Sequence, residues 1–412
     1  MSIDKTVNKL NSHWDEENPV KNLLTPLNSE NHMMFSHNYI PTGIAMLDLA
    51  LFGGIKVGHT TTITGKTNSS KTTVALNCCK QALIKEPDKY VIYVDTENLI
   101  DPLWVEKIIG EDILDSNRFY LVKPDFAEQA MDTTDHFMRE NLASLIVIDS
   151  LATMSSVKEV SNPSEKENMA LRARAVGKLC RKIVSLENWM QKKYGTAPTT
   201  LFLNQVISSM SLYGSPYETT AGYAAKYKSV DTIWLNCTKT HYYKDEVTQT
   251  DNPDYNEHEF SFKKDKNIYI PKGSYNLIRN PENPLGAGYI DDAEQLYLMC
   301  RYHGILANKG IEGLKENIGL KSDIVRELRT NELFKKLVTR KLIRMARKKK
   351  KMREFPPDKY LIIDDAFTIP RDNKSEEADE KELNNETEQG SEGKESKQSV
   401  QKKPRARKKS SK

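Results

Sequence analysis

Residues 63–73, ITGKTNSSKTT, have the residue types that could bind phosphate groups. They follow a β-branched run and precede a helical pattern, and the backbone amides of such a loop can surround an anion at the start of a helix. In this arrangement Gly65 allows a sharp turn, Lys71 reaches the β and γ phosphate oxygens, and Thr72 offers a hydroxyl to Mg²⁺. Ser70, however, stands where the pattern GxxxxGK[ST] has its second glycine. The motif alone is weak, and an ordinary polar strand-to-helix turn is the alternative.

Three further apolar runs end in polar residues that could complete such a site. LIVID ends in Asp149, which could hold Mg²⁺, and YVIYVD is followed at once by Thr96 and Glu97, a candidate general base for an attacking water. TLFLN ends in Asn204 and is followed by Gln205, whose amide could contact a γ-phosphate. Each residue alone could be an ordinary strand-end polar group. Because parallel strands place their carboxyl ends at one edge of a sheet, the four together indicate one nucleotide site.

The elements that must position these residues follow a repeated pattern of strand and helix. The pattern predicts strands at 59–65, 90–95, 118–122, 145–149, 200–204 and 231–236, and helices at 71–85, 101–110, 126–142 and 166–194. This alternation is typical of a mostly parallel central sheet flanked by helices, an α/β fold. After Asp245 the segments EFSFKKDKNIYI and GSYNLI predict antiparallel strands that extend the sheet.

The order of the motifs resembles the RecA-like recombinases of bacteria and their bacteriophage counterparts. Beyond Gly65, Lys71 and Thr72, the resemblance rests on VDTENLIDP, VIDSLATM, FLNQ and YETTAGYAAKY, and it covers about residues 39–278. It implies a RecA-type P-loop ATPase core that uses ATP and Mg²⁺. It also implies a DNA-dependent ATPase that forms helical filaments on single-stranded DNA, searches duplex DNA for homology and exchanges strands in recombination and repair.

The resemblance also implies roles for individual residues. Those expected to act in catalysis are Lys71, Glu97, Gln205, Lys264 and Lys266, the last two reaching a neighbouring subunit's ATP, although solvated strand lysines are the alternative for them. Those expected to bind the nucleotide are Gly65, Lys66, Thr67, Asn68, Ser69, Ser70, Lys71, Thr72, Thr73, Asp101, Trp104 and Asp149. Of these, Thr72 and Asp149 are the expected Mg²⁺ ligands. Trp104 would pack on adenine, with a helix residue facing the core as the alternative.

DNA contacts are expected from two loops and one helix. By resemblance, loops at about 155–169 and 206–222 line the filament axis. Basic residues at i, i+4, i+7 and i+8 on the following helix gather on one face, which suits sequence-independent phosphate contacts, and a solvated helix face is the alternative. The expected DNA-binding residues are Arg172, Arg174, Lys178, Arg181, Met210, Tyr213, Tyr217 and Gly222, with the aromatic and methionine side chains stacking on or wedging between bases. Lys182 belongs to the same helical stripe.

Composition sets the remaining expectations. The chain has 412 residues, 29% charged and 38% hydrophobic, with a net charge of +4, so the distribution of charge rather than its total must indicate a nucleic-acid partner. No apolar run approaches the roughly 18–20 residues that span a bilayer, which predicts a location in the cytoplasm or nucleus. The resemblance implies the cytoplasm of a prokaryotic or phage-infected cell. The five cysteines form no CxxC pair and are expected to be reduced core thiols.

The chain divides into four expected segments. Residues 1–38 are an N-terminal arm and candidate polymerisation segment, 39–290 the ATPase core, 291–372 a basic helical module, and 373–412 a disordered charged tail that either modulates DNA binding or only solubilises the chain. Single-strand-binding and mediator proteins are further expected partners. Two other functions stay open: a RecA-fold hexameric helicase, which would need an N-terminal domain larger than this arm, and a non-hydrolysing scaffold or regulatory relative.

Overall fold

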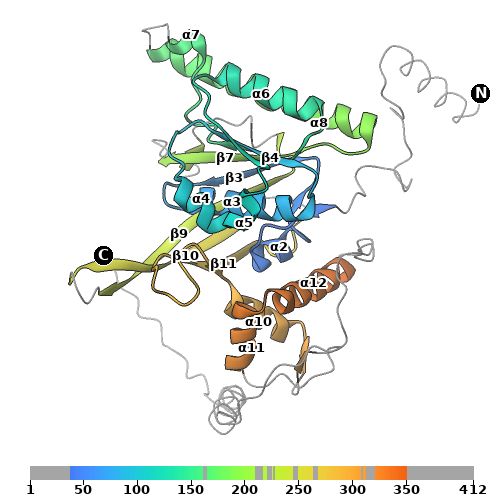
Figure 1. Ribbon diagram of the computed structural model, residues 1–412, viewed down its shortest axis with the longest axis vertical. Helices are drawn as coiled ribbons and strands as arrows, with labels where there is room; N and C mark the ends of the chain where they lie inside the picture. The colour runs from blue at the N-terminus through green and yellow to red at the C-terminus, as the bar shows by residue number, and fades with distance from the viewer. Residues whose placement is uncertain are drawn as a thin grey trace, which may run out of the picture.

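A computed structural model of the chain describes residues 38–160, 165–208, 217–219, 225, 228–244, 249–262, 268–307, 310–311 and 321–349. Its centre is a ten-stranded sheet with the strand order β12-β11-β10-β9-β3-β7-β6-β4-β5, and β8 (Tyr217–Thr219) pairs with β7 beside this path. Helices lie on both faces of the sheet (Figure 1). The predicted α/β fold, with a mostly parallel central sheet flanked by helices, is confirmed.

The parallel part of the sheet carries the predicted strand ends. Its strands are β3 (Thr60–Gly65), β4 (Tyr90–Asp95), β5 (Phe119–Val122), β6 (Ala143–Asp149) and β7 (Thr199–Ser208). Side chains alternate between the two faces, as the pleat requires. On β6, Leu145 and Val147 join one buried cluster, whereas Ile146 and Ile148 join the other. The near-continuous apolar runs seen in the sequence follow from this burial on both faces.

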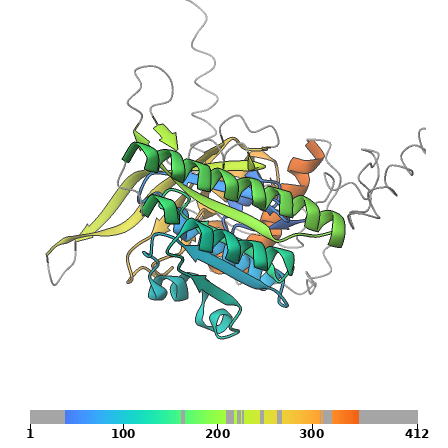
Figure 2. The same ribbon diagram turned by 90° about the horizontal axis from the view of Figure 1, so that it is seen from above.

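Two helical layers cover these faces. One contains α2 (Ala45–Ala50), α3 (Lys71–Lys85), α4 (Pro102–Ile109) and α5 (Glu111–Leu114), and the other contains α6 (Ala127–Arg139) and α8 (Glu165–Tyr194). Figure 2 shows α8 running alongside α6 across its face of the sheet, preceded by the short helix α7 (Val157–Val160). The predicted helices thus form, with ends that differ by at most three residues from the expected ones.

Beyond β3 the sheet continues as an antiparallel extension, whose first strand still pairs parallel with β3. It consists of β9 (Asp231–Lys244), β10 (Asp251–Phe262), β11 (Lys272–Ile278) and β12 (Ile290–Asp291). The sequence predicted that the strand from 231 would end at 236, and this end was wrong. β9 continues to Lys244 because β10 pairs with it along its length, from Phe262 with Ile233 to Asp251 with Lys244. The resulting hairpin projects from the body of the protein (Figure 1).

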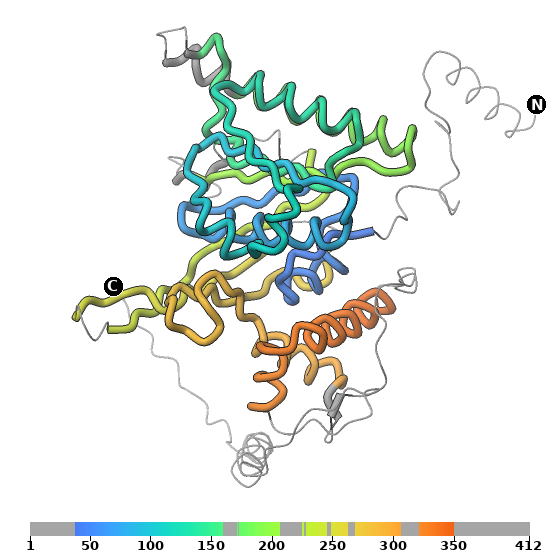
Figure 3. Tube along the Cα trace, viewed as in Figure 1, coloured from blue at the N-terminus to red at the C-terminus, as the bar shows by residue number. Residues whose placement is uncertain are grey.

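The described part of the expected C-terminal module is mainly helical, as predicted, and it also contains one short strand pair. Its helices are α10 (Ala293–Tyr302), α11 (Lys321–Thr330) and α12 (Glu332–Lys349), and they gather beside α2 (Figure 3). Lys335 of α12 forms a buried ion pair of 2.6 Å with Asp292, whose other carboxylate oxygen accepts the Met46 N–H at 3.0 Å. Arg347 donates to the Phe52 carbonyl oxygen at 2.8 Å. The ion pair ties α12 to the residue before α10 and, through it, to α2, and removing either partner would leave a buried charge without its counter-charge. The Arg347 hydrogen bond joins α12 to the segment that follows α2.

Short strand pairs complete the described chain: β1 (Tyr39–Ile40) with β2 (Ile55–Lys56), and β13 (Leu306–Ala307) with β14 (Gly310–Ile311). The expected N-terminal arm to residue 37, residues 350–372 of the expected module and the expected tail lie outside the described residues. Within the described residues, no helix combines the length and apolar character needed to cross a membrane. Of the five free cysteines, four are buried as predicted, whereas Cys237 is only half-buried.

Candidate active site

The loop between β3 and α3 is the predicted phosphate-binding segment. Gly65 does not have a positive φ; instead, a Cβ at this position would approach within 2.5 Å of the Leu235 carbonyl oxygen, so glycine is needed for close packing. The left-handed conformations fall on Asn68 (φ 62°) and Ser70 (φ 63°). Sequence reasoning placed the turn at Gly65, and the structure places it at these two residues. The loop leads directly into the N-terminus of α3, as an anion site requires.

Lys71 is held inside the loop rather than in solvent. Only 8% of its surface is exposed, and its Nζ donates to the Lys66 and Gly65 carbonyl oxygens at 2.7 and 3.2 Å. Burial lowers the pKa of Lys71, and the nearby carboxylates of Asp149 and Glu97 oppose that effect. The amine is therefore folded against the concave side of the loop, within the electrostatic reach of both predicted carboxylates.

Asp149 and Thr72 meet as the sequence predicted. The Thr72 hydroxyl donates to Asp149 Oδ2 at 2.9 Å, and the Tyr93 hydroxyl donates to the same oxygen at 2.6 Å. Burial raises the pKa of Asp149, while these two hydrogen bonds act to lower it. A hydroxyl and a carboxylate at this distance are oxygen donors of the kind Mg²⁺ prefers, so the pair fits a Mg²⁺ ion.

Glu97 and Gln205 also meet. Gln205 Nε2 donates to Glu97 Oε1 at 2.6 Å, and the Ser150 hydroxyl donates to the same oxygen at 2.5 Å. The turn that carries Glu97 is fixed by Asp95, whose carboxylate accepts the backbone N–H groups of Glu97 and Ile100 at 3.1 and 3.2 Å. We call the set Thr72, Tyr93, Glu97, Asp149 and Gln205 the carboxylate rim. It brings the ends of β4, β6 and β7 to one edge beside Lys71.

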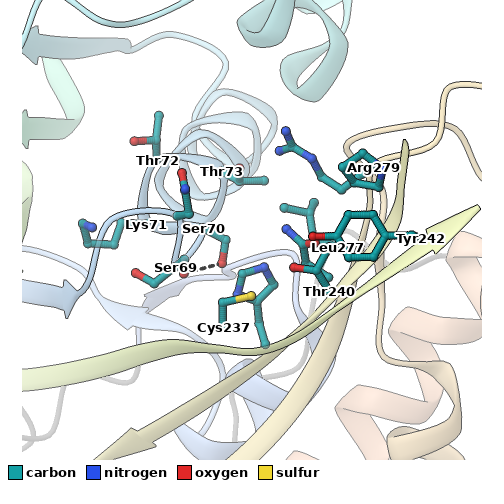
Figure 4. Close-up of a pocket in the computed structure, with 14 residues that line it drawn as sticks. Ser69, Ser70, Lys71, Thr72, Thr73, Cys237, Thr240, Tyr242, Leu277 and Arg279 are labelled. Atoms are coloured by element: carbon teal, nitrogen blue, oxygen red, sulfur yellow. Dashed lines mark hydrogen bonds between the residues drawn. The ribbon is translucent and has the colours of Figure 1, made fainter. Parts of the chain in front are cut away.

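The opposite side of the loop faces the antiparallel extension. A cavity of about 410 Å³ lies there between the loop, the start of α3 and strands β9 to β11 (Figure 4). Several side chains of this extension line the cavity or contact the loop, and we call five of them the antiparallel face: Cys237, His258, Tyr275, Leu277 and Arg279, the last of which directly follows β11. Tyr275 and Ser70 hydroxyl oxygens are 2.7 Å apart. The loop is thus flanked by the carboxylate rim on one side and by the antiparallel face on the other.

Asp101 is the N-cap of α4, and Trp104 lies in the first turn of that helix. Trp104 is half-buried and packs against the core, and the Arg279 guanidinium lies over its ring at 5.4 Å. A Cβ at Gly288 would meet the same ring at 3.5 Å. Asp101 caps α4 by accepting the Leu103 N–H at 3.0 Å. The adenine-packing role of Trp104 and the nucleotide contact of Asp101 stay predictions, since each residue also has a structural contact.

The predicted DNA-binding residues are only partly described. Arg174, Lys178 and Arg181 are exposed on α8, as the stripe requires, while Lys182 pairs with Asp135 at 3.4 Å. The Arg172 side chain lies outside the described residues, and of Tyr217 only the backbone, in β8, is described. Three other predicted DNA-binding residues lie wholly outside the described residues: Met210, Tyr213 and Gly222. The two lysines predicted to act in catalysis, Lys264 and Lys266, also lie outside them.

Sequence reasoning missed several residues of the site. Tyr93 precedes Asp95 by two positions in its strand, so alternation alone could have placed both on one face. Ser150 follows Asp149 directly and was not considered. Tyr275 and Arg279 had no local signal, because their contacts with Ser70 and Trp104 join segments that are far apart in the sequence.

Comparison of the sequence with known proteins shows the family to which the chain is similar. A model of the RecA N-terminal domain matches residues 14–254, more than half of the chain. Protein RecA of Fusobacterium nucleatum subsp. nucleatum is 35% identical over 192 residues, which is 46% of this chain and 48% of the relative. Protein RecA of Streptomyces coelicolor is 35% identical over 190 residues, with the same coverage of 46% and 48%. The chain spans about half the length of the curated relatives it matches.

Proposed function

Because the chain belongs to the RecA family, we propose that it is an ATP-dependent DNA strand-exchange recombinase. In this proposal it binds Mg²⁺-ATP between adjacent subunits, forms a helical filament on single-stranded DNA, and pairs that strand with homologous duplex DNA. The observation that carries the proposal is the meeting of Lys71 with the carboxylate rim, in a chain with the RecA N-terminal domain match.

The phosphate loop and the carboxylate rim would have different roles in binding and hydrolysing ATP. Lys71 and the backbone amides at the start of α3 would bind the phosphates, and Thr72 with Asp149 would hold Mg²⁺, which neutralises phosphate charge when bound. Glu97 would accept a proton from the attacking water. Its Oε1 already accepts hydrogen bonds from Gln205 and Ser150, so these two side chains would orient the carboxylate.

Gln205 offers a route from the ATP site to DNA. Its amide contacts Glu97, and its strand β7 continues to Ser208, into the segment 206–222 expected to be the second DNA loop. A side chain that contacts both the hydrolytic carboxylate and the γ-phosphate would shift when the phosphate leaves. Such a shift would move the loop and so couple the nucleotide state to DNA affinity, which is a coupling between two sites.

The exposed residues Arg174, Lys178 and Arg181 on α8 support the DNA part of the proposal. Arginine and lysine bind phosphates without reading bases, as a protein that acts on any sequence needs. Lys264 and Lys266 would complete a neighbouring subunit's ATP site, and single-strand-binding and mediator proteins would be further partners. We place this activity in the cytoplasm of a prokaryotic or phage-infected cell.

The test is ATP turnover with and without single-stranded DNA, followed by negative-stain imaging with a slowly hydrolysed ATP analogue. We expect hydrolysis that single-stranded DNA stimulates, and helical filaments on that DNA. Closed rings would instead favour the helicase alternative. No hydrolysis under either condition would contradict the proposal and favour the scaffold alternative.

A further inference from the structure

Ser70 has a backbone conformation that favours glycine. It is the N-cap of α3, with φ 63° and ψ 20°, and it immediately precedes Lys71. A residue with a Cβ is strained in this left-handed region, and such strain persists only where the surroundings hold it. The phosphate loop must therefore contain a contact that stabilises Ser70 in this position.

The Ser70 hydroxyl does not cap the helix, although serine at this position commonly does so. Instead it donates to the Ser69 carbonyl oxygen at 2.6 Å, and its oxygen lies 2.7 Å from the Tyr275 hydroxyl. Since a serine hydroxyl has one proton, and that proton is engaged with Ser69, the Tyr275 O–H must donate to Ser70 Oγ. Ser70 thus depends on Tyr275 as its donor.

Tyr275 is well placed to hold the loop. It lies on β11, its side chain is 1% exposed, and burial raises its pKa, so the hydroxyl keeps its proton. The residue directly across on β10 is His258, whose ring stacks on that of Tyr275 at 5.4 Å and 20°. Burial lowers the pKa of His258 to about 4, so a neutral ring supports the tyrosine. The donor is therefore fixed by the sheet on one side and by the stack on the other.

We propose that Tyr275 is a positioning residue for nucleotide binding, which holds the phosphate loop in its left-handed turn by donating a hydrogen bond to Ser70. The inference rests on the proposed ATP function of this loop. A RecA-type loop with glycine at this position would need no such donor, because glycine adopts the left-handed conformation freely. Ser70 and Tyr275 therefore form a matched pair, separated by 205 positions in the sequence.

A double-mutant cycle tests this pairing, with the dissociation constant of a fluorescent ATP analogue measured on the full chain without DNA. We expect Tyr275→Phe to raise the constant about 3- to 10-fold, as for the loss of one buried hydrogen bond. In a Ser70→Gly background the same change should have less than about a twofold effect. In a Ser70→Ala background the backbone strain remains but the hydrogen-bond acceptor is gone, so Tyr275→Phe should again leave the dissociation constant nearly unchanged.

Tyr289→Phe is the matched control, since it removes a hydroxyl that donates to the Arg329 carbonyl oxygen at 2.9 Å in the C-terminal module. It should leave nucleotide affinity unchanged, and thermal unfolding of each variant shows whether it is folded. An equal loss of affinity from Tyr275→Phe in all three backgrounds would overturn the pairing, as would no loss in the Ser70 background. If the unaltered chain itself bound no nucleotide, the proposed function would fail first, and this inference with it.

Discussion

The carboxylate rim and the antiparallel face lie on opposite sides of one phosphate loop, but they are built differently. At the rim, hydroxyl and amide donors converge on single carboxylate oxygens. Thr72 and Tyr93 donate to Asp149, and Gln205 donates to Glu97 together with Ser150, which lies next to the rim. In the antiparallel face, ring stacking and one hydroxyl contact replace that network. The carboxylate rim therefore provides charged groups where the phosphate bond would be broken. The antiparallel face instead provides a packed surface against which the nucleotide would bind.

This difference predicts that variants of the rim and variants of the face change different kinetic constants. A group that stabilises charge only in the transition state changes kcat, and a group that binds substrate and transition state alike changes KM. Rim variants should therefore lower kcat with little change in nucleotide affinity. Variants of the face and of its neighbour Trp104 should change KM and leave kcat nearly intact.

Lys71 lies where the two sides meet, so its removal should have the largest effect. Lys71→Ala should reduce ATP hydrolysis stimulated by single-stranded DNA to background, at least about 100-fold, because a preorganised charge is lost from the phosphates. Steady-state phosphate release measures this. The matched control is Lys336→Ala, an exposed lysine of α12 paired with Glu332 at 3.3 Å, which should retain full activity. Undiminished hydrolysis by Lys71→Ala would refute the site.

Glu97→Gln should give the clearest separation of kcat from affinity. The amide keeps the size of the side chain but cannot accept a proton from water, so kcat should fall by about 10²-fold, the lower end of what a general base contributes. Binding of a fluorescent ATP analogue should change less than about threefold. Glu140→Gln, an exposed position at the end of α6, serves as the control. A parallel loss of affinity would mean that the rim does not differ from the face as argued.

Gln205→Ala tests whether the rim also transmits a signal. Without DNA, hydrolysis should stay within a few-fold of the unaltered chain, whereas stimulation by single-stranded DNA should fall about 10-fold, a typical size for coupling between two sites. The ratio of the two rates is the measurement. If the variant lost basal and stimulated hydrolysis by the same factor, Gln205 would support Glu97 without coupling it to DNA.

The same contrast explains what the sequence could and could not reveal. In the sequence, an apolar run ends at or shortly before each of four residues: Lys71, Glu97, Asp149 and Gln205. The rule that parallel strands end at one edge was therefore enough to bring them together. The contacts of Tyr275 with Ser70 and of Arg279 with Trp104 depend on where pairing across the sheet places β11 and the residue after it. That placement leaves no local pattern in the sequence. For the same reason the end of β9 was misplaced by eight residues, since its outer part forms a strand only against β10.

Trp104→Ala should have the smallest effect and decides between the two roles open to this side chain. If adenine packs on the ring, the loss of the aromatic contact should raise KM for ATP about 2- to 10-fold with kcat unchanged, and Trp104→Phe should restore most of the affinity. If the ring only fills the core beside Arg279 and Gly288, the alanine variant should lose thermal stability while KM stays the same. Steady-state kinetics and thermal unfolding on the same protein samples distinguish the outcomes. A fall in kcat alone would contradict both roles, because it would assign Trp104 to the chemistry of the carboxylate rim.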